Sequence, residues 1–127
     1  MNKILRLKAI TLFLFTAALL LSVNSYGANK KGTPEIKPVA PSVVCMINDA
    51  VMNRPQIPVE VDGKTYYGCC ENCKERLKTD ESVRFGADPL TGEKVDKAKA
   101  FIMEAANGDA LYFESRSTAQ KYFETNQ

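Results

Sequence analysis

The sequence predicts a small α+β domain made of two strand–turn–strand–helix units. Two stretches have the pattern of β-hairpins, residues 57–67 (IPVEVDGKTYY) and residues 100–113. Each contains a turn dipeptide that tolerates positive φ, DG in the first and NG in the second. Each hairpin is followed by a short segment with helical spacing of its apolar residues. Strands and helices that alternate in this way within one short chain favour a single mixed domain.

Each predicted helix has its own apolar anchor. The first, ENCKERLKTD at residues 71–80, has Leu77 as its main apolar residue. The second, residues 115–125, presents Tyr122 and Phe123 on one face. Ser117 and Gln120 have the spacing of a capping box, which predicts the start of this second helix.

The two units form an internal repeat with an offset of 45 residues. The offset superimposes the turn glycine, a strand tyrosine, the residue at the helix start and the helix anchor: Gly63 on Gly108, Tyr67 on Tyr112, Cys70 on Ser115, and Leu77 on Tyr122. Where the first unit has GCCENC, the second has FESRST. Only the first unit can therefore carry thiol chemistry, and we expect the second to cover it as a structural partner.

The N-terminal segment predicts export. It has three basic residues among the first eight, an apolar run over residues 9–21, and small residues before a cleavage site after Gly27. The alternative is an uncleaved membrane anchor, but an apolar run of this length is shorter than the roughly 20 residues that span a bilayer. We interpret residues 1–27 as a signal peptide and the mature protein as periplasmic, where disulfides can form.

Behind the signal peptide, the composition predicts a flexible Pro-rich tether over residues 28–44. The alternative is that the end of this stretch docks on the domain as a strand. The folded part would then cover residues 45–127, with a cysteine-bearing unit at 45–82 and a cysteine-free unit at 86–124.

Charge and composition exclude several functions. The whole chain has a formal net charge of +2, and removing the three basic residues of the signal segment leaves −1. Without a Lys/Arg-rich block, a nucleic-acid partner has little support. The chain has no histidine, so the common nucleophile–base pairs of enzymes are not available. Acids such as Asp49 are interpreted as part of a solvated surface, and we expect a non-enzymatic protein.

The four cysteines carry the functional signal. Cys69 and Cys73 stand at i and i+4, and Cys70 and Cys73 at i and i+3, so each pair shares a helix face. Their place at a helix start favours the thiolate form. Three hypotheses remain open: a soft-metal site, structural disulfides, or a redox couple at Cys70-x-x-Cys73. A disulfide from Cys45 to this cluster would contribute on the order of 3 kcal/mol.

The run from Cys45 through GKTYYGCCENCKERL resembles the TRASH and YHS group of small metal-associated domains. It has a cysteine, 23 intervening residues, an aromatic pair, and then Cys-x3-Cys. The later DPLTGEKV, ALYFES and KYF resemble a second, cysteine-free YHS-type unit, so the likeness covers about residues 43–124. The resemblance implies a zinc-ribbon or treble-clef-like first unit and a role in heavy-metal sensing, trafficking or resistance. It implies Cys45, Cys69 and Cys73 as ligands, with Cys70 commonly present in the group as well.

Thiolates without histidine suit thiophilic ions such as Cu(I), Zn(II), Cd(II) or Hg(II), whereas calcium and magnesium require oxygen ligands. Met46, beside Cys45, is a weak additional candidate because thioether sulfur favours Cu(I). We therefore predict an exported protein that binds copper or zinc through Cys45, Cys69 and Cys73, with Cys70 as the candidate fourth ligand. Its expected partners are the metal ion and another metal-handling protein. Once the signal is cleaved, no membrane span is expected.

Overall fold

A computed structural model describes residues 36–126 of the chain. In this part, four two-stranded antiparallel sheets and two α-helices form a small domain, which confirms the α+β prediction. The elements are η2 (Pro41–Val43), β1 (Val44–Cys45), β2 (Ala50–Val51), β3 (Ile57–Val61), β4 (Lys64–Gly68), α2 (Glu71–Thr79), η3 (Glu81–Arg84), β5 (Phe85–Ala87), β6 (Lys94–Asp96), β7 (Phe101–Glu104), β8 (Ala110–Phe113) and α3 (Arg116–Thr125).

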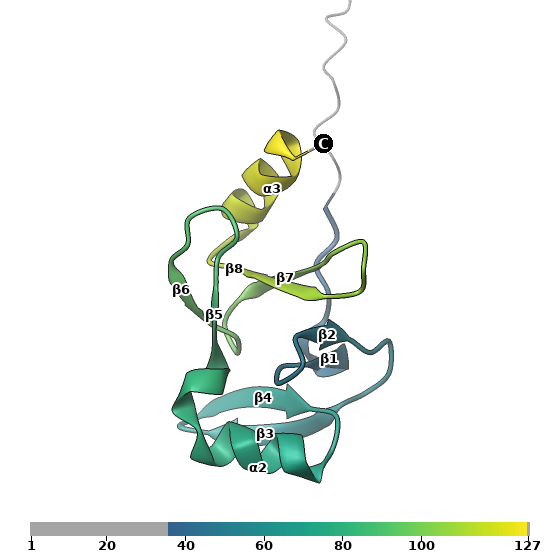
Figure 1. Cartoon of the computed structure of the whole chain (residues 1–127), viewed down its shortest axis with the longest axis vertical. Coiled ribbons are helices and arrows are strands. Elements are labelled where there is room, and N and C mark those ends of the chain that lie inside the picture. The colour runs from purple at the N-terminus through teal and green to yellow at the C-terminus, as the bar shows by residue number, and fades with distance from the viewer. Residues whose placement is uncertain (1–35, 127) are drawn as a thin grey trace, which may run out of the picture. The chain divides into compact units, whose positions relative to one another are not determined.

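Both predicted units are present, as β3–β4–α2 and β7–β8–α3 (Figure 1). The offset of 45 residues holds best at the helix starts. Cys70, the N-cap of α2, has φ −155° and ψ 171°, and Ser115, the N-cap of α3, has φ −156° and ψ 167°. The turn glycines also match, because Gly63 and Gly108 both have positive φ. The first unit thus places a cysteine where the second uses a serine cap.

The predicted capping box of the second helix is wrong by two residues. Ser115, rather than Ser117, is the N-cap, and its hydroxyl accepts a hydrogen bond from the backbone N–H of Thr118 at 3.2 Å. The Thr118 hydroxyl in turn accepts one from the Ser115 backbone N–H at 3.3 Å. The extended backbone of Ser115 allows this reach, and threonine takes the part that glutamate or glutamine usually has.

The strands β1 and β2 connect the two units and lie between their hairpins (Figure 1). The backbone N–H of Met46 donates to the carbonyl of Tyr67 in β4 at 2.9 Å. On the other side, the N–H of Ala110 in β8 donates to the carbonyl of Asp49 at 2.7 Å. The loop over residues 46–49 is therefore held by both units.

The two units share a hydrophobic core, which confirms that the second covers the first. The main cluster takes side chains from β1, both hairpins, α2 and the loop after β1: Val44, Met46, Val59, Tyr66, Leu77, Ile102, Ala110 and Tyr112. A second cluster lies beneath α3 and contains Phe113 and Ala119, with the Phe113 and Tyr122 ring centroids 5.5 Å apart. At about 25 cal/mol per Å² of buried apolar surface, a core this small leaves a modest margin of stability.

The expected flexible tether is wrong for the part that the structure describes. Ile36 is 5% exposed in the second cluster, and Val44 is fully buried in β1. Between them, the N–H of Val39 donates to the carbonyl of Ile102 in β7 at 2.8 Å. The apolar side chains between the prolines supply burial that composition alone does not show. The predicted signal peptide lies outside the described residues.

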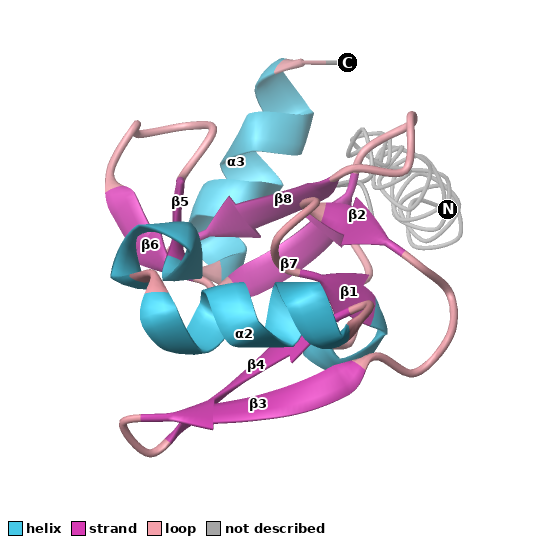
Figure 2. Cartoon of the chain, turned by 60° about the horizontal axis from the view of Figure 1, so that its bottom comes forward, coloured by secondary structure: helices cyan, strands magenta, loops and turns pink. Residues whose placement is uncertain are grey.

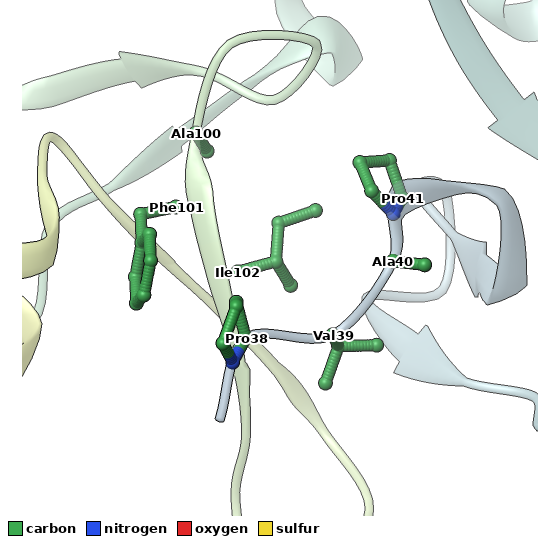
Figure 3. Close-up of a pocket in the computed structure, with 7 residues that line it drawn as sticks. All are labelled: Pro38, Val39, Ala40, Pro41, Ala100, Phe101 and Ile102. Atoms are coloured by element: carbon green, nitrogen blue, oxygen red, sulfur yellow. The ribbon is translucent and has the colours of Figure 1, made fainter. Parts of the chain in front are cut away.

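An apolar pocket of about 410 Å³ opens between this packed segment and β7 (Figure 3). Its lining is Pro38, Val39, Ala40, Pro41, Ala100, Phe101 and Ile102. No cysteine contributes to it, so it is separate from the thiols. Among the residues described, no helix is both long enough and apolar enough to cross a membrane.

The segment DPLTG forms the turn between β5 and β6, a hairpin that was not predicted from the sequence. Asp88 begins this turn and is only 1% exposed. Its carboxylate accepts hydrogen bonds from the backbone N–H groups of Leu90 at 2.8 Å and Glu114 at 2.9 Å. Burial by itself would raise the pKa of Asp88, but these N–H groups outweigh it and lower the pKa. The carboxylate therefore fastens the β5–β6 turn to the end of β8.

Candidate metal centre

Three of the four cysteine sulfur atoms converge at one point between β1 and the start of α2. The Sγ atoms of Cys45, Cys69 and Cys73 all lie within 4.8 Å of one another. The Cys69 and Cys73 sulfurs are 3.6 Å apart. Cys45 comes from β1, Cys69 from the junction after β4, and Cys73 from the first turn of α2, so the centre joins segments far apart in the sequence. Figure 2 shows β1 beside α2 and the β3–β4 hairpin.

Gly68 at the end of β4 allows the helix to begin this close to the strand. A Cβ atom at this position would lie 3.0 Å from the Cβ of Cys73 and 3.2 Å from the backbone nitrogen of Lys74. Any larger residue would push the first turn of α2 away from β4. The chain then extends through Cys70, the N-cap, and Cys73 is 5% exposed. The glycine directly before the cysteines is the sequence signal for this close approach, which was not predicted from the sequence.

Cys45 is fully buried at the start of a tight loop. Burial would raise the pKa of its thiol, but the backbone N–H groups of Asn48 and Ile47 stabilise the thiolate, and the pKa is lowered overall. The loop can close because Asp49 adopts a left-handed conformation with φ 49°. The backbone of this loop thus provides an electropositive environment for one sulfur.

The other two thiols of the group have the opposite tendency. Burial raises the pKa of Cys73 to about 12, and the neighbouring thiols Cys70 and Cys69 add to this effect. The pKa of Cys69 is raised first by its hydrogen bond to Cys45. Cys45 therefore ionises most readily of the three thiols, whereas the surroundings of Cys69 and Cys73 favour their protons. A thiophilic cation can replace these protons, because its charge stabilises all three thiolates together.

Two polar side chains that were not predicted from the sequence, Asn48 and Lys97, support the centre. The Asn48 amide donates to the sulfur of Cys69 at 3.6 Å, which connects the β1 loop to the helix start. Lys97, in the second unit, has a side chain only 5% exposed. Its ammonium donates to the carbonyl of Met46 at 2.8 Å and to the carboxylate of Asp49 at 2.5 Å.

Asp49 was expected on a solvated surface; its side chain is 49% exposed, and it also pairs with the buried ammonium of Lys97. The Lys97 ammonium also lies 5.1 Å from the centre of the Tyr112 ring. A lysine in the polar run DKAKA carries no local signal of burial, so only the contact between the units reveals this role. Lys97 of the cysteine-free unit thus holds the backbone of Met46, the residue next to Cys45.

The remaining two predicted ligands, Cys70 and Met46, do not belong to this group of three. Cys70 is exposed and does not belong to the group of three, although its sulfur lies 3.4 Å from that of Cys73. Met46 is fully buried in the main hydrophobic cluster, which also contains Val59 and Leu77. All four cysteines are free thiols.

Comparisons with known proteins found no matching protein-family model, no matching curated protein and no matching solved structure. The functional argument therefore rests on the centre itself.

Proposed function

We propose that this chain is an exported, non-enzymatic protein that binds a thiophilic metal ion, copper or zinc, through Cys45, Cys69 and Cys73. The observation that carries the proposal is the mutual approach of the three sulfurs to within 4.8 Å. Two thiolates bound to one Zn(II) at about 2.3 Å are separated by roughly 3.8 Å in tetrahedral geometry. The 3.6 Å between Cys69 and Cys73 is close to that separation.

The chemistry of the donor atoms narrows the choice of metal ion. Three sulfurs without histidine or carboxylate suit a soft cation, and soft thiolate sites favour Cu(I) and Zn(II). Two of the three sulfurs belong to residues that are buried, which protects a bound ion from exchange with solvent ligands. The backbone N–H groups around Cys45 and the Asn48 amide near Cys69 are outer partners of the kind that orient metal ligands.

The resemblance to TRASH and YHS domains supports the same function and a treble-clef-like or zinc-ribbon-like first unit. The position of Cys45 in a short strand and of Cys69 and Cys73 at a helix start agrees with such a unit. Trafficking, buffering and resistance are the roles that this likeness favours. We place the protein in the periplasm because its first residues have the pattern of a signal peptide.

Metal titration of the reduced protein tests the proposal. Zn(II) and Cu(I) are each titrated against a competing chelator, and the complexes are weighed by native mass spectrometry. We expect one ion per chain, a loss of more than about 100-fold in affinity for Cys69→Ser or Cys73→Ser, and little change for Cys70→Ser. Stoichiometric binding by a Cys69→Ser/Cys73→Ser double variant would show that the assignment is wrong.

Native mass spectrometry of the protein as isolated, before any reduction, separates the disulfide alternative. A stapled interaction module would lose two mass units per disulfide and carry no metal. Its serine variants would unfold more easily but would have no metal affinity to lose.

A further inference from the structure

The described part of the chain contains one sulfur close to the metal centre that the three-thiol group does not use. Cys70 is exposed, and its sulfur lies 3.4 Å from that of Cys73. This is shorter than the 3.6 Å between Cys69 and Cys73. Cys73 is thus a member of two arrangements, the metal-binding group and a close pair with Cys70.

The two sulfurs are close enough for a disulfide to form between them. A disulfide needs the sulfurs at about 2.05 Å, and the present separation closes by a modest rotation of the side chains. Cys70 is the N-cap and Cys73 the third residue of α2, so the bond would lie across the first turn. The exposed sulfur is open to an incoming reagent, whereas Cys73 is 5% exposed. Exchange must therefore begin at Cys70.

We propose that Cys70 and Cys73 form a reversible disulfide, exchanged through Cys70, and that this bond closes the three-thiol centre to metal. This inference rests on the proposed metal-binding function. With Cys73 held in the disulfide, only Cys45 and Cys69 remain as ligands. The partner is an external dithiol that reduces the bond, or a disulfide that restores it.

The exchange is balanced in both directions. One thiolate of the dithiol attacks the Cys70 sulfur, the bond between Cys70 and Cys73 breaks, and its electron pair leaves with Cys73 as a thiolate. The second thiol of the reductant then attacks the mixed disulfide and releases Cys70. The protein gains two electrons and two protons, and the dithiol becomes a disulfide. The reverse reaction oxidises the protein at the expense of an external disulfide.

The repeat suggests a matched control. The position equivalent to Cys70 in the second unit is Ser115, which caps α3 in the same backbone conformation. Cys70→Ser should therefore keep the helix start, because serine is a favoured N-cap residue. It removes the exchanging sulfur and leaves all three proposed ligands in place.

Two measurements on the purified protein test the inference. In the first, the metal-free wild type is oxidised with oxidised glutathione, its free thiols are alkylated, and the products are mapped by tandem mass spectrometry. We expect Cys70 linked to Cys73, with Cys45 and Cys69 alkylated. A predominant Cys69–Cys73 bond, or any predominant bond that includes Cys45, would overturn the proposal.

In the second, the zinc affinity of the wild type and of Cys70→Ser is measured in reduced and in oxidised glutathione. Oxidation should weaken zinc binding by the wild type by more than about 100-fold, since losing a ligand exceeds the 10–100-fold effect of an outer partner. Dithiothreitol should restore it, and Cys70→Ser should bind zinc equally in both buffers. Suppose that oxidation weakens zinc binding by Cys70→Ser as much as by the wild type, and that the reduced protein still binds zinc. The proposed role of the Cys70–Cys73 disulfide would then be refuted. If the reduced wild type binds neither zinc nor Cu(I), the proposed function fails, and the proposed role of the disulfide fails with it. The two failures are therefore distinguishable.

Discussion

Replacement of Lys97 by methionine is the most direct test of how the second unit supports the proposed metal centre. Methionine keeps most of the aliphatic volume of lysine but removes the ammonium. The carbonyl of Met46, in a fully buried residue, then loses the hydrogen bond that it accepts at 2.8 Å. Asp49 loses its ion pair, but its side chain is 49% exposed and can be solvated.

The expected cost follows from these two contacts. An unsatisfied buried carbonyl costs about 1–3 kcal/mol. A half-exposed ion pair adds at most about 1 kcal/mol. We therefore expect Lys97→Met to lower the free energy of unfolding by about 2–3 kcal/mol. Because the loop that begins at Cys45 is loosened, zinc affinity should also fall, by about 10-fold, as for the loss of an outer partner of a metal ligand.

The assay is urea unfolding of the reduced, metal-free protein, followed by circular dichroism. Lys99→Met is the matched control, since Lys99 is an exposed lysine two residues away. Surface substitutions of this kind usually change stability by less than about 0.5 kcal/mol. If Lys97→Met and Lys99→Met unfold at the same urea concentration, the buried ammonium does not anchor the loop and the reasoning is refuted.

Three further predictions concern the glycine before the thiols, the buried carboxylate and the second helix. Gly68→Ala should destabilise the protein by about 1–3 kcal/mol and weaken zinc binding, because the added Cβ meets Cys73 at 3.0 Å; unchanged unfolding and zinc titrations would contradict this. The lowered pKa of Asp88 means that its contribution is present above about pH 4 and is lost as the pH falls through the folded-state pKa. Asp88→Asn should therefore cost about 1.5–3 kcal/mol at pH 7, and its difference from wild type should shrink on acidification; a pH-independent difference in unfolding free energy would refute this. Ser115→Ala should cost about 1 kcal/mol and Ser117→Ala much less, and equal melting curves for the two would place the cap elsewhere.

Local sequence chemistry determined the two strand–turn–strand–helix units of this protein. The DG and NG turns and the apolar spacing after them predicted both hairpins and both helices, because turn conformation and helical periodicity depend on neighbouring residues. The same local logic placed Cys70 at a helix start through its equivalence with Ser115. It was less reliable where several residues compete for one position, as at the cap of α3. There Thr118 completes a box that the usual pattern assigns to a longer side chain.

The tertiary structure decided which residues from distant elements come into contact. Cys45 lies 24 positions before Cys69, and only the pairing of the β1 loop with Tyr67 brings their sulfurs together. Lys97 reaches that loop from 48 residues beyond Asp49, and no local pattern marks a lysine for burial.

The packing of residues 36–44 likewise depends on contacts with distant parts of the chain. Its prolines predicted an extended chain, but whether an extended chain is free or docked depends on an apolar surface elsewhere, here Ile102 and the cluster beneath α3. Spacing along the chain identified the thiols. Their separation into a group of three, two of them buried, and an exposed fourth depends on contacts between distant segments. The sequence does not encode these contacts in any local pattern.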